Sequence, residues 1–334
     1  MSVSPTPSGM PSDDADGRLA IVLAAAGLHP GADPAAVTSH SNDTWLIEDP
    51  QQGQVVLRVC WRGDTDRLRR EGTVGADLPA EVGYPPVLGF GRVSGDRDLT
   101  WTVTRRLAGT SLADAWPGLH EVARRDACRQ VAHALRAMHE WSPSAAARAV
   151  LVPTPLGAHP STSEVIGRSI NPLPDGLALL VEDARRRGAD ATVLDEALRL
   201  VDLDAQLVPR LDDPAAPHVI HADLHLNNVW WDGHAVSGLL DLEWVRLGPR
   251  YVDVARIKDN ADADELEGLT SHPMLLRCLR EDYPELFEVD RLPARLRVLQ
   301  VGEQIRDLCI WGLPVDEATM PVDHPMRLLR HLLG

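Results

Sequence analysis

Apolar and polar residues alternate over four short segments in the first third of the chain. Alternation with a period of two, bounded by glycine and proline, is typical of β-strands. The turn at 49–53 would join the first two strands as a hairpin, and segment 64–78 has the spacing of a helix. A short alanine-rich helix is predicted at 17–28. The predicted strands are 44–48, 54–60, 84–93 and 99–105. This part of the chain is therefore predicted to be a mostly antiparallel sheet with one main helix.

Beyond residue 118, most apolar positions recur every three or four residues, which is typical of amphipathic helices. Segment 142–174 breaks this pattern because it is rich in Pro, Ser and Ala, and we expect an extended loop or a mobile cover there. The predicted helices are 119–141, 176–187, 191–211, 251–258, 274–280, 293–311 and 325–333.

The two patterns meet at Arg106-Leu107-Ala108-Gly109, which ends the last strand as a hinge would. We therefore expect an α+β fold of two lobes: an N-terminal lobe at 17–106 with an antiparallel sheet and one main helix, and a largely helical C-terminal lobe at 107–334. Residues 1–16 are predicted to be a disordered tail. Residues 142–217 are predicted to be a variable insertion in the C-terminal lobe.

One polar cluster interrupts the C-terminal part. His221, Asp223 and Asn228 have the spacing H-x-D-x-x-x-x-N, and Asp241 ends a hairpin that turns at Asp232-Gly233. Phosphoryl transfer suits this set, because its catalysis rests on positioning and charge neutralisation. Asp223 would orient an acceptor hydroxyl and take its proton, Asn228 and Asp241 would hold magnesium, and His221 would support the loop. The alternative is a chance group of polar residues in a surface loop, against which the hairpin argues.

An arginine lies on a strand face that is otherwise apolar. Arg58 should therefore be buried, and a buried arginine needs an anionic partner. Glu71 on the predicted helix is the expected partner, and the alternative for Glu71 is a solvated helix carboxylate. Before the hairpin, the polar stretch 39–43 contains Ser41 and Asn42, and its backbone N–H groups could fold over a phosphate.

Composition restricts the possible binding partners of the protein more than it restricts the possible folds. The 334 residues carry a formal charge of −16, which argues against nucleic acid and anionic membranes. The same charge would attract a cationic small molecule, or it serves solubility alone. The four cysteines lie far apart without metal-ligand spacing, and the chain starts without a secretory pattern. We therefore expect reduced thiols in a cytoplasmic protein.

Three motifs resemble those of the aminoglycoside phosphotransferase family, the small-molecule branch of the protein-kinase-like fold. HADLHLNN resembles its H-G-D-x-H-x-x-N loop, LLDLEW its I-D-x-E-W metal segment, and TRRLAGTSL its hinge. The resemblance covers 37–257 and, more loosely, the rest of the chain. It implies Asp223 as the catalytic aspartate, Asn228 and Asp241 as the magnesium ligands, and Glu71 as the glutamate of an N-lobe ion pair.

The resemblance also implies roles for residues outside the polar cluster. The main chain at Arg105 and Leu107 would bind the purine, and Asp253, in YVDVAR, would brace the catalytic loop. Glu243, in place of the glycine of the kinase D-F-G, would contact metal or substrate. Arg58 stands where the family usually has its phosphate-binding lysine, and this exchange is not neutral because a guanidinium is bulkier and planar.

We therefore expect an O-phosphotransferase that uses ATP or GTP with magnesium and acts on a hydroxyl of a small, polar, cationic molecule, first of all an antibiotic. The helices at 176–187 and 191–211 would line the acceptor pocket. The alternatives are a kinase of a housekeeping metabolite (an amino sugar, choline or homoserine) and a nucleotide-binding pseudokinase. A protein kinase is disfavoured, because no D-F-G and A-P-E pair is recognisable. The protein would act as a monomer or homodimer.

Overall fold

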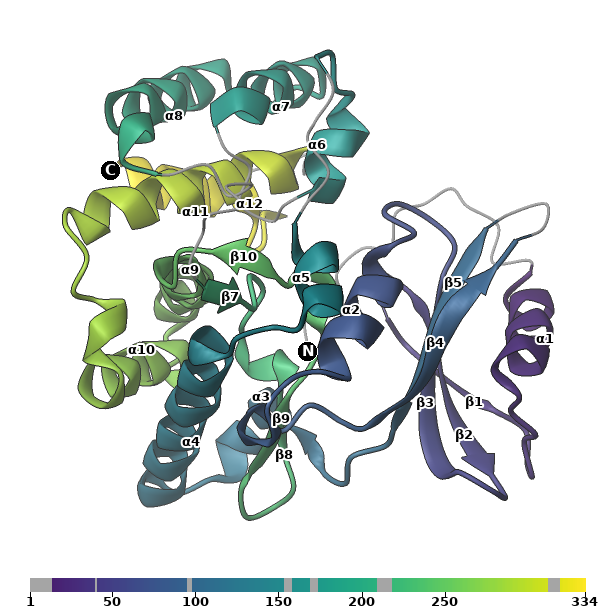
Figure 1. Ribbon diagram of the computed structural model, residues 1–334. Coiled ribbons are helices and arrows are strands. Elements are labelled where there is room, and N and C mark those ends of the chain that lie inside the picture. Colours follow the sequence, from purple (N-terminus) through teal and green to yellow (C-terminus); the bar gives the residue numbers. More distant parts are fainter. Residues whose placement is uncertain are drawn as a thin grey trace.

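The computed structural model describes residues 14–39, 41–94, 98–152, 158–168, 174–208, 218–311 and 319–334. Figure 1 shows two lobes, a sheet-containing N-terminal lobe and a larger, mainly helical C-terminal lobe. Most of the predicted tail, residues 1–13, lies outside the described residues. Its last two residues belong to the first helix, α1 (Ala15–Ala26). Within the described ranges, no helix is long and apolar enough to cross a membrane.

The N-terminal lobe is built on a five-stranded sheet in which every neighbouring pair is antiparallel. The four predicted strands are all present, and the predicted turn joins the first two of them as a hairpin. A short exposed edge strand, β1, was not predicted. The strands, in their order across the sheet, are β1 (Ala35–Val37), β2 (Asp43–Asp49), β3 (Gly53–Cys60), β5 (Leu99–Arg105) and β4 (Val87–Val93).

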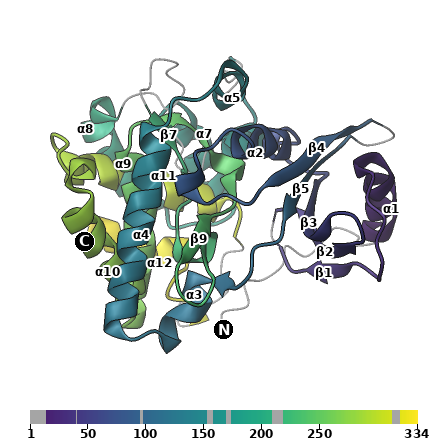
Figure 2. The same ribbon diagram turned by 60° about the horizontal axis from the view of Figure 1, so that its bottom comes forward.

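The two faces of this sheet pack against different helices, as Figure 2 shows. Alternation along β3 places Val55, Leu57 and Val59 on one face, where they are fully buried in a cluster that includes residues of α1. Arg58 points to the opposite face, toward α2 (Arg67–Gly75), the predicted main helix. Because α2 lies between the sheet and the C-terminal lobe, this face belongs to the region where the lobes meet.

The connection between the lobes leaves little room for side chains. Gly109 has a φ of +103°, and a Cβ atom there would lie 1.9 Å from the carbonyl oxygen of Trp231. The indole Nε1 of Trp230 donates to the carbonyl oxygen of Ala108 at 3.0 Å. Glycine is therefore required where the chain passes from the sheet into the C-terminal lobe.

The C-terminal lobe contains every helix predicted for it. The helix that follows Asp241 is longer than predicted and includes the acidic run 259–267. The expectation of an extended loop or a mobile cover at 142–174 was wrong in part, because two short helices form there, the first capped by Ser144. Residues 153–157 and 169–173 of this segment lie outside the described residues. The helices are α3 (Leu112–Ala115), α4 (Glu121–Glu140), α5 (Ala145–Leu151), α6 (Thr162–Arg168), α7 (Pro174–Arg186), α8 (Ala191–Asp204), α9 (Tyr251–Glu267), α10 (Ser271–Asp282), α11 (Leu292–Leu308) and α12 (Pro325–Leu333).

Short strands frame the polar cluster inside this lobe. The predicted hairpin forms from β8 and β9, and β6 adds to its edge, while β7 pairs with β10 in a separate antiparallel ribbon. The side chain of Asp232 closes the hairpin turn by accepting from two backbone N–H groups. These strands are β6 (Thr110–Ser111), β7 (His218–Ile220), β8 (Val229–Trp231), β9 (Val236–Leu239) and β10 (Arg246–Gly248).

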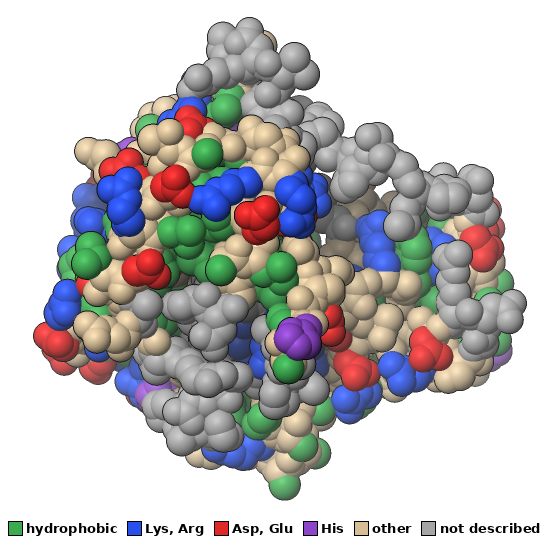
Figure 3. Space-filling view, turned by 90° about the horizontal axis from the view of Figure 1, so that it is seen from above, with side chains coloured by type: hydrophobic (Ala, Val, Ile, Leu, Met, Phe, Trp, Pro, Cys, Tyr) green, Lys and Arg blue, Asp and Glu red, His purple; other side chains and the backbone are tan. Residues whose placement is uncertain are grey.

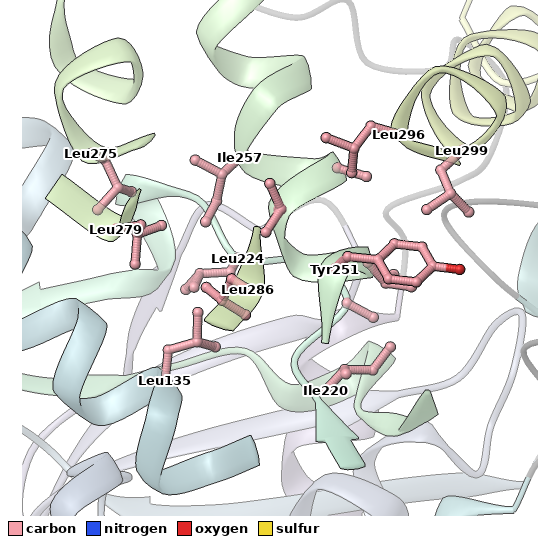
Figure 4. Close-up of a cluster of buried hydrophobic side chains, with 14 of the residues drawn as sticks. Leu135, Ile220, Leu224, Tyr251, Ile257, Leu275, Leu279, Leu286, Leu296 and Leu299 are labelled. Carbon is pink, nitrogen blue, oxygen red and sulfur yellow. The ribbon is translucent and has the colours of Figure 1, made fainter. Parts of the chain in front are cut away.

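A large apolar core fixes the loop between β7 and β8. Figure 4 shows Leu224 of this loop among Leu135 of α4, Ile257 of α9 and Leu279 of α10. All four side chains are fully buried. The loop that carries the polar cluster is therefore anchored from three helices.

Candidate active site

The loop at residues 221–228 carries His221, Asp223 and Asn228, and its backbone is held by one buried carboxylate. Asp253 of α9 is fully buried and accepts from the backbone N–H groups of Ala222 at 2.6 Å and His221 at 3.1 Å. It also contacts Nε2 of His139 at 2.8 Å. These contacts stabilise a left-handed backbone at Ala222, whose φ is +65°. Asp253 therefore connects α9 to the backbone of this loop.

Inside the loop, polar side chains are paired with backbone atoms. His221 Nε2 lies 2.9 Å from the carbonyl oxygen of Leu240, and Nδ1 accepts from the N–H of Asp223 at 3.3 Å. Asn228 Nδ2 donates to the carbonyl oxygen of Asp223 at 2.9 Å, which leaves the amide oxygen for another partner. The carbonyl oxygen of Asn228 accepts from Leu240 N–H at 2.7 Å, so the loop is joined to the strand that leads to Asp241.

Asp241 ends that strand in a left-handed conformation with φ of +61°. Its Oδ1 accepts from Nη2 of Arg58 at 2.7 Å, and its side chain is about one-third exposed. Burial alone would raise the pKa of Asp241, but the guanidinium of Arg58 outweighs that effect and lowers the pKa below its ordinary value. The carboxylate is therefore ionised and partly open.

Arg58 and Glu71 form the predicted contact across the lobe. Arg58 Nη1 lies 2.6 Å from both carboxylate oxygens of Glu71. Glu71 is 1% exposed and also accepts from the hydroxyl of Tyr84 at 2.8 Å and the N–H of Leu242 at 3.3 Å. The alternative of a solvated carboxylate is thus wrong for Glu71, since it is buried and joins α2 to the segment after Asp241.

Glu243 is bound to the polar stretch before the hairpin. Its Oε2 accepts from Ser41 Oγ and from Asn42 Nδ2, each at 3.0 Å, while Arg58 and Arg67 lie 3.6 Å away. Burial, followed by the charge of Asp241, raises the pKa of Glu243 to about 7. The sequence predicted phosphate contacts from backbone N–H groups of 39–43, whereas here the side chains of this stretch contact Glu243. His40, inside the stretch, lies outside the described residues.

A buried chain of charges behind Asp223 was not predicted. Arg256 Nε donates to Asp223 Oδ1 at 2.8 Å, and its Nη1 bonds Glu303 of α11, which is fully buried. Burial raises the pKa of Asp223, and Arg256 opposes that shift. The sequence feature that could have indicated this contact is the helical spacing. Arg256 follows Asp253 by three residues on a helix and so lies on the same helix face.

The two residues predicted to bind a purine through the main chain lie at the connection between the lobes. The N–H of Arg105 already donates to the carbonyl oxygen of Pro86 at 2.9 Å. The N–H of Leu107 has no backbone partner within the described ranges. Of the two N–H groups, that of Leu107 is therefore the one open to a base.

The chain is similar to known proteins over most of its length. The model of the phosphotransferase enzyme family matches residues 35–273. A thermostable mutant of aminoglycoside phosphotransferase APH(4)-Ia, in a ternary complex with ADP and hygromycin B, is 19% identical with a TM-score of 0.62, over 94% of this chain and 97% of that one. Aminoglycoside 2'-phosphotransferase-IIIa with GDP is 15% identical with a TM-score of 0.63, over 96% and 99%.

A third similar structure is a candidate fructosamine-3-kinase from Thermobifida fusca. It is 19% identical with a TM-score of 0.54, over 96% of this chain and all of that one. Among curated proteins, none matches the chain. At these identities the structural likeness establishes a shared two-lobed fold over nearly the whole chain.

Proposed function

Because the chain belongs to the phosphotransferase enzyme family, we propose that it transfers the γ-phosphoryl group of ATP or GTP to a hydroxyl of a small, polar, cationic molecule. One observation carries this proposal. Asp223, Asn228 and Asp241 are linked by two backbone-mediated hydrogen bonds, one through the Asp223 carbonyl and one through Leu240. The carboxylate that would orient a hydroxyl and the oxygens that would hold a metal thus belong to one braced unit.

The donor set suits magnesium. Asn228 offers a neutral amide oxygen and Asp241 an ionised carboxylate, and magnesium prefers such oxygen ligands together with phosphate oxygens and water. Within the described ranges, no group of three or more His, Cys, Asp and Glu side chains could hold a metal alone. We therefore assign the ion jointly to Asn228, Asp241 and the nucleotide. Bound there, it would supply charge neutralisation on the phosphates.

Asp223 would orient the acceptor hydroxyl and accept its proton as the phosphoryl group transfers in line. Its Oδ1 is occupied by Arg256, so Oδ2 is the oxygen that would face the hydroxyl. His225, whose Nε2 lies 3.8 Å from Asp223, has a pKa held well below its ordinary value by burial and by Arg256. A neutral His225 is suited to supporting the loop and not to competing as an acid.

Arg58 would take the place of a phosphate-binding lysine. Its Nη1 is committed to Glu71, whereas its Nη2 contacts the partly exposed Asp241. Phosphate oxygens would share Nη2 with Asp241, because a planar guanidinium can donate to two anions at once. Ser41, Asn42 and Glu243 would flank the phosphates, and the main chain at Arg105 and Leu107 would meet the purine.

For the acceptor, an antibiotic is the first candidate. Two structurally similar proteins are aminoglycoside phosphotransferases, and one of them was solved with hygromycin B. The formal charge of −16 would favour a cationic molecule. The second candidate, a housekeeping metabolite such as an amino sugar, choline or homoserine, is favoured by the likeness to the candidate fructosamine-3-kinase.

The proposal includes a cytoplasmic location, supported by four buried free thiols, which are typical of a reducing compartment. It also includes action as a monomer or homodimer. A pseudokinase is disfavoured, because Asp223, Asn228 and Asp241 are all present and mutually positioned.

The test is nucleotide turnover with magnesium, ATP and GTP over a panel of antibiotics and amino sugars. Wild type is compared with Asp223→Asn and with Asp126→Asn, a control that neutralises an exposed carboxylate on α4. We expect acceptor-stimulated turnover that falls by about 10²–10⁴-fold in Asp223→Asn and stays unchanged in the control. An equal response of both variants would refute the role of Asp223. If neither ATP nor GTP binds in the presence of magnesium, the roles proposed for Arg58 and Asp241 are refuted.

A further inference from the structure

A cavity lies apart from the proposed catalytic groups, between α2, α5, α6 and the segment that follows Glu243. Its volume is about 510 Å³, within the range of small-molecule sites. Side chains from both lobes line it, including Arg70 of α2, Arg168 of α6 and Arg246 of β10. The view from above shows a hollow between the lobes with Lys and Arg side chains beside it (Figure 3).

Arg246 is the unusual member of this lining. It is 6% exposed, yet its Nε and Nη2 atoms have no hydrogen-bond partner among the described residues. Its Nη1 makes one long contact, 3.4 Å, with the carbonyl oxygen of Arg168. An unpaired buried guanidinium is costly, and such groups are ordinarily paired with an anion.

The charges around Arg246 do not supply that anion. Burial, then the nearby cations Arg70, Arg168 and Arg306, lower its pKa to about 10. Asp253 is the acidic group that opposes this shift, but its two oxygens already serve His139 and the backbone of the 221–228 loop.

The acidic side chains that line the cavity are engaged elsewhere. Asp64 binds Arg70, Asp66 contacts Arg69 at 3.4 Å, and Glu164 accepts from Ser161 at the start of α6. Arg246 thus borders this polar cavity, and within the described lining its guanidinium, whose Nε and Nη2 are themselves buried, has no carboxylate of its own.

We propose that this cavity binds a small oxyanion, a phosphate or carboxylate group, through the fork of Arg246. Two parallel N–H donors match the two oxygens of such a group. Arg70 on the same lining also donates to the carbonyl oxygen of Glu243 at 3.5 Å, and it lies one residue from Glu71. An anion held there would lie between α2 and the segment that follows Asp241, at a site separate from the one proposed for the nucleotide.

The test measures anion binding by calorimetry on the full chain saturated with magnesium and a non-hydrolysable ATP analogue, so that the phosphate subsites of the nucleotide are filled. Inorganic phosphate, sulfate and succinate are the three probes, and they separate a phosphate-type ligand from a carboxylate. Arg246→Gln is compared with Arg129→Gln, which removes an exposed arginine of α4 that is outside the cavity lining. We expect at least one probe to bind wild type and the control equally, and about tenfold or more weaker to Arg246→Gln.

Two results would overturn the inference: no probe binds wild type, or Arg246→Gln binds as tightly as the control. In case Arg246→Gln does not fold, wild-type crystals soaked in selenate provide an independent measurement. A selenium anomalous peak within hydrogen-bond distance of the Arg246 guanidinium supports the site. A cavity without such a peak at full soak concentration contradicts it.

Discussion

Replacing Arg58 with methionine would leave Glu71 and Asp241 facing each other without their shared cation. Glu71 is 1% exposed and keeps only Tyr84 and the Leu242 N–H as donors. Three hydrogen bonds of 2.6–2.7 Å would be lost in one step. The change should therefore lower the free energy of unfolding of the protein even when no nucleotide is bound.

The size of this loss in stability follows from the burial of the ion pairs that Arg58 makes with Glu71 and Asp241. Removing one partner of a buried ion pair ordinarily destabilises a protein by about 3–5 kcal/mol, because the other charge remains desolvated. We expect Arg58→Met to fall in that range. Adding Glu71→Gln removes the stranded carboxylate, so the double variant should recover about 2 kcal/mol. Arg58→Lys keeps the charge but cannot reach both carboxylates with the same fork, and about 1–2 kcal/mol should be lost.

Urea unfolding without nucleotide, followed by circular dichroism, measures these free energies. Arg129→Met is the matched control, since Arg129 is 58% exposed and its ion pair with Asp126 should be worth less than about 1 kcal/mol. A loss in Arg58→Met no larger than in the control would refute the buried cluster. A double variant that is no more stable than Arg58→Met would show that Glu71 is not the stranded charge.

Three further predictions use other parts of the site. Glu243 holds its proton in the folded state between its ordinary pKa of 4.5 and about 7, so its contribution to stability is lost as pH rises through that window. The stability of wild type minus that of Glu243→Gln should fall over that range in urea titrations, and a flat difference contradicts this. Gly109→Ala should lower stability by about 2 kcal/mol or more in the same assay, because the added Cβ would meet the Trp231 carbonyl at a φ of +103°; an unchanged midpoint would mean the connection relaxes freely. Asp253→Asn should cost about 3 kcal/mol, since an amide cannot accept from both loop N–H groups and pair with His139. In that variant, hydrogen exchange at Ala222 should accelerate, and unchanged protection would argue against the bracing role.

Local patterns predicted those parts of the molecule whose determinants lie close together in sequence. The Asp232-Gly233 turn and the flanking apolar residues define the β8–β9 hairpin. Alternation on β3 predicted a buried Arg58, and a buried arginine requires a carboxylate, which led to Glu71 on the next helix. In the structure the Arg58 side chain is partly buried, with 16% of it exposed, and it contacts Glu71. In each case the rule, a hydrophobic period or the pairing of opposite charges, connects residues at most 13 positions apart in the sequence.

The features that were missed depend on contacts between distant segments. The burial of two carboxylates in the acidic run 259–267 was not predicted: Asp259 and Asp262 are buried against Gln304 and Gln300 of α11. About forty residues separate each pair, and nothing local distinguishes these carboxylates from their exposed neighbours. Within segment 142–174, the helices at Ala145–Leu151 and Thr162–Arg168 were also missed, because Ser and Ala suit helix caps and helices as well as loops.

The chain of charges from Asp223 through Arg256 to Glu303 has a consequence for how this enzyme can change over generations. It ends on α11, and α11 packs against α7 and α8 of the insertion, the segment expected to vary with the acceptor. A substitution that reshapes the insertion to admit a new molecule can shift α11, and the shift reaches the carboxylate that would receive the proton. Specificity and rate should therefore not evolve as separate traits, and many single steps toward a new acceptor should need a compensating second one.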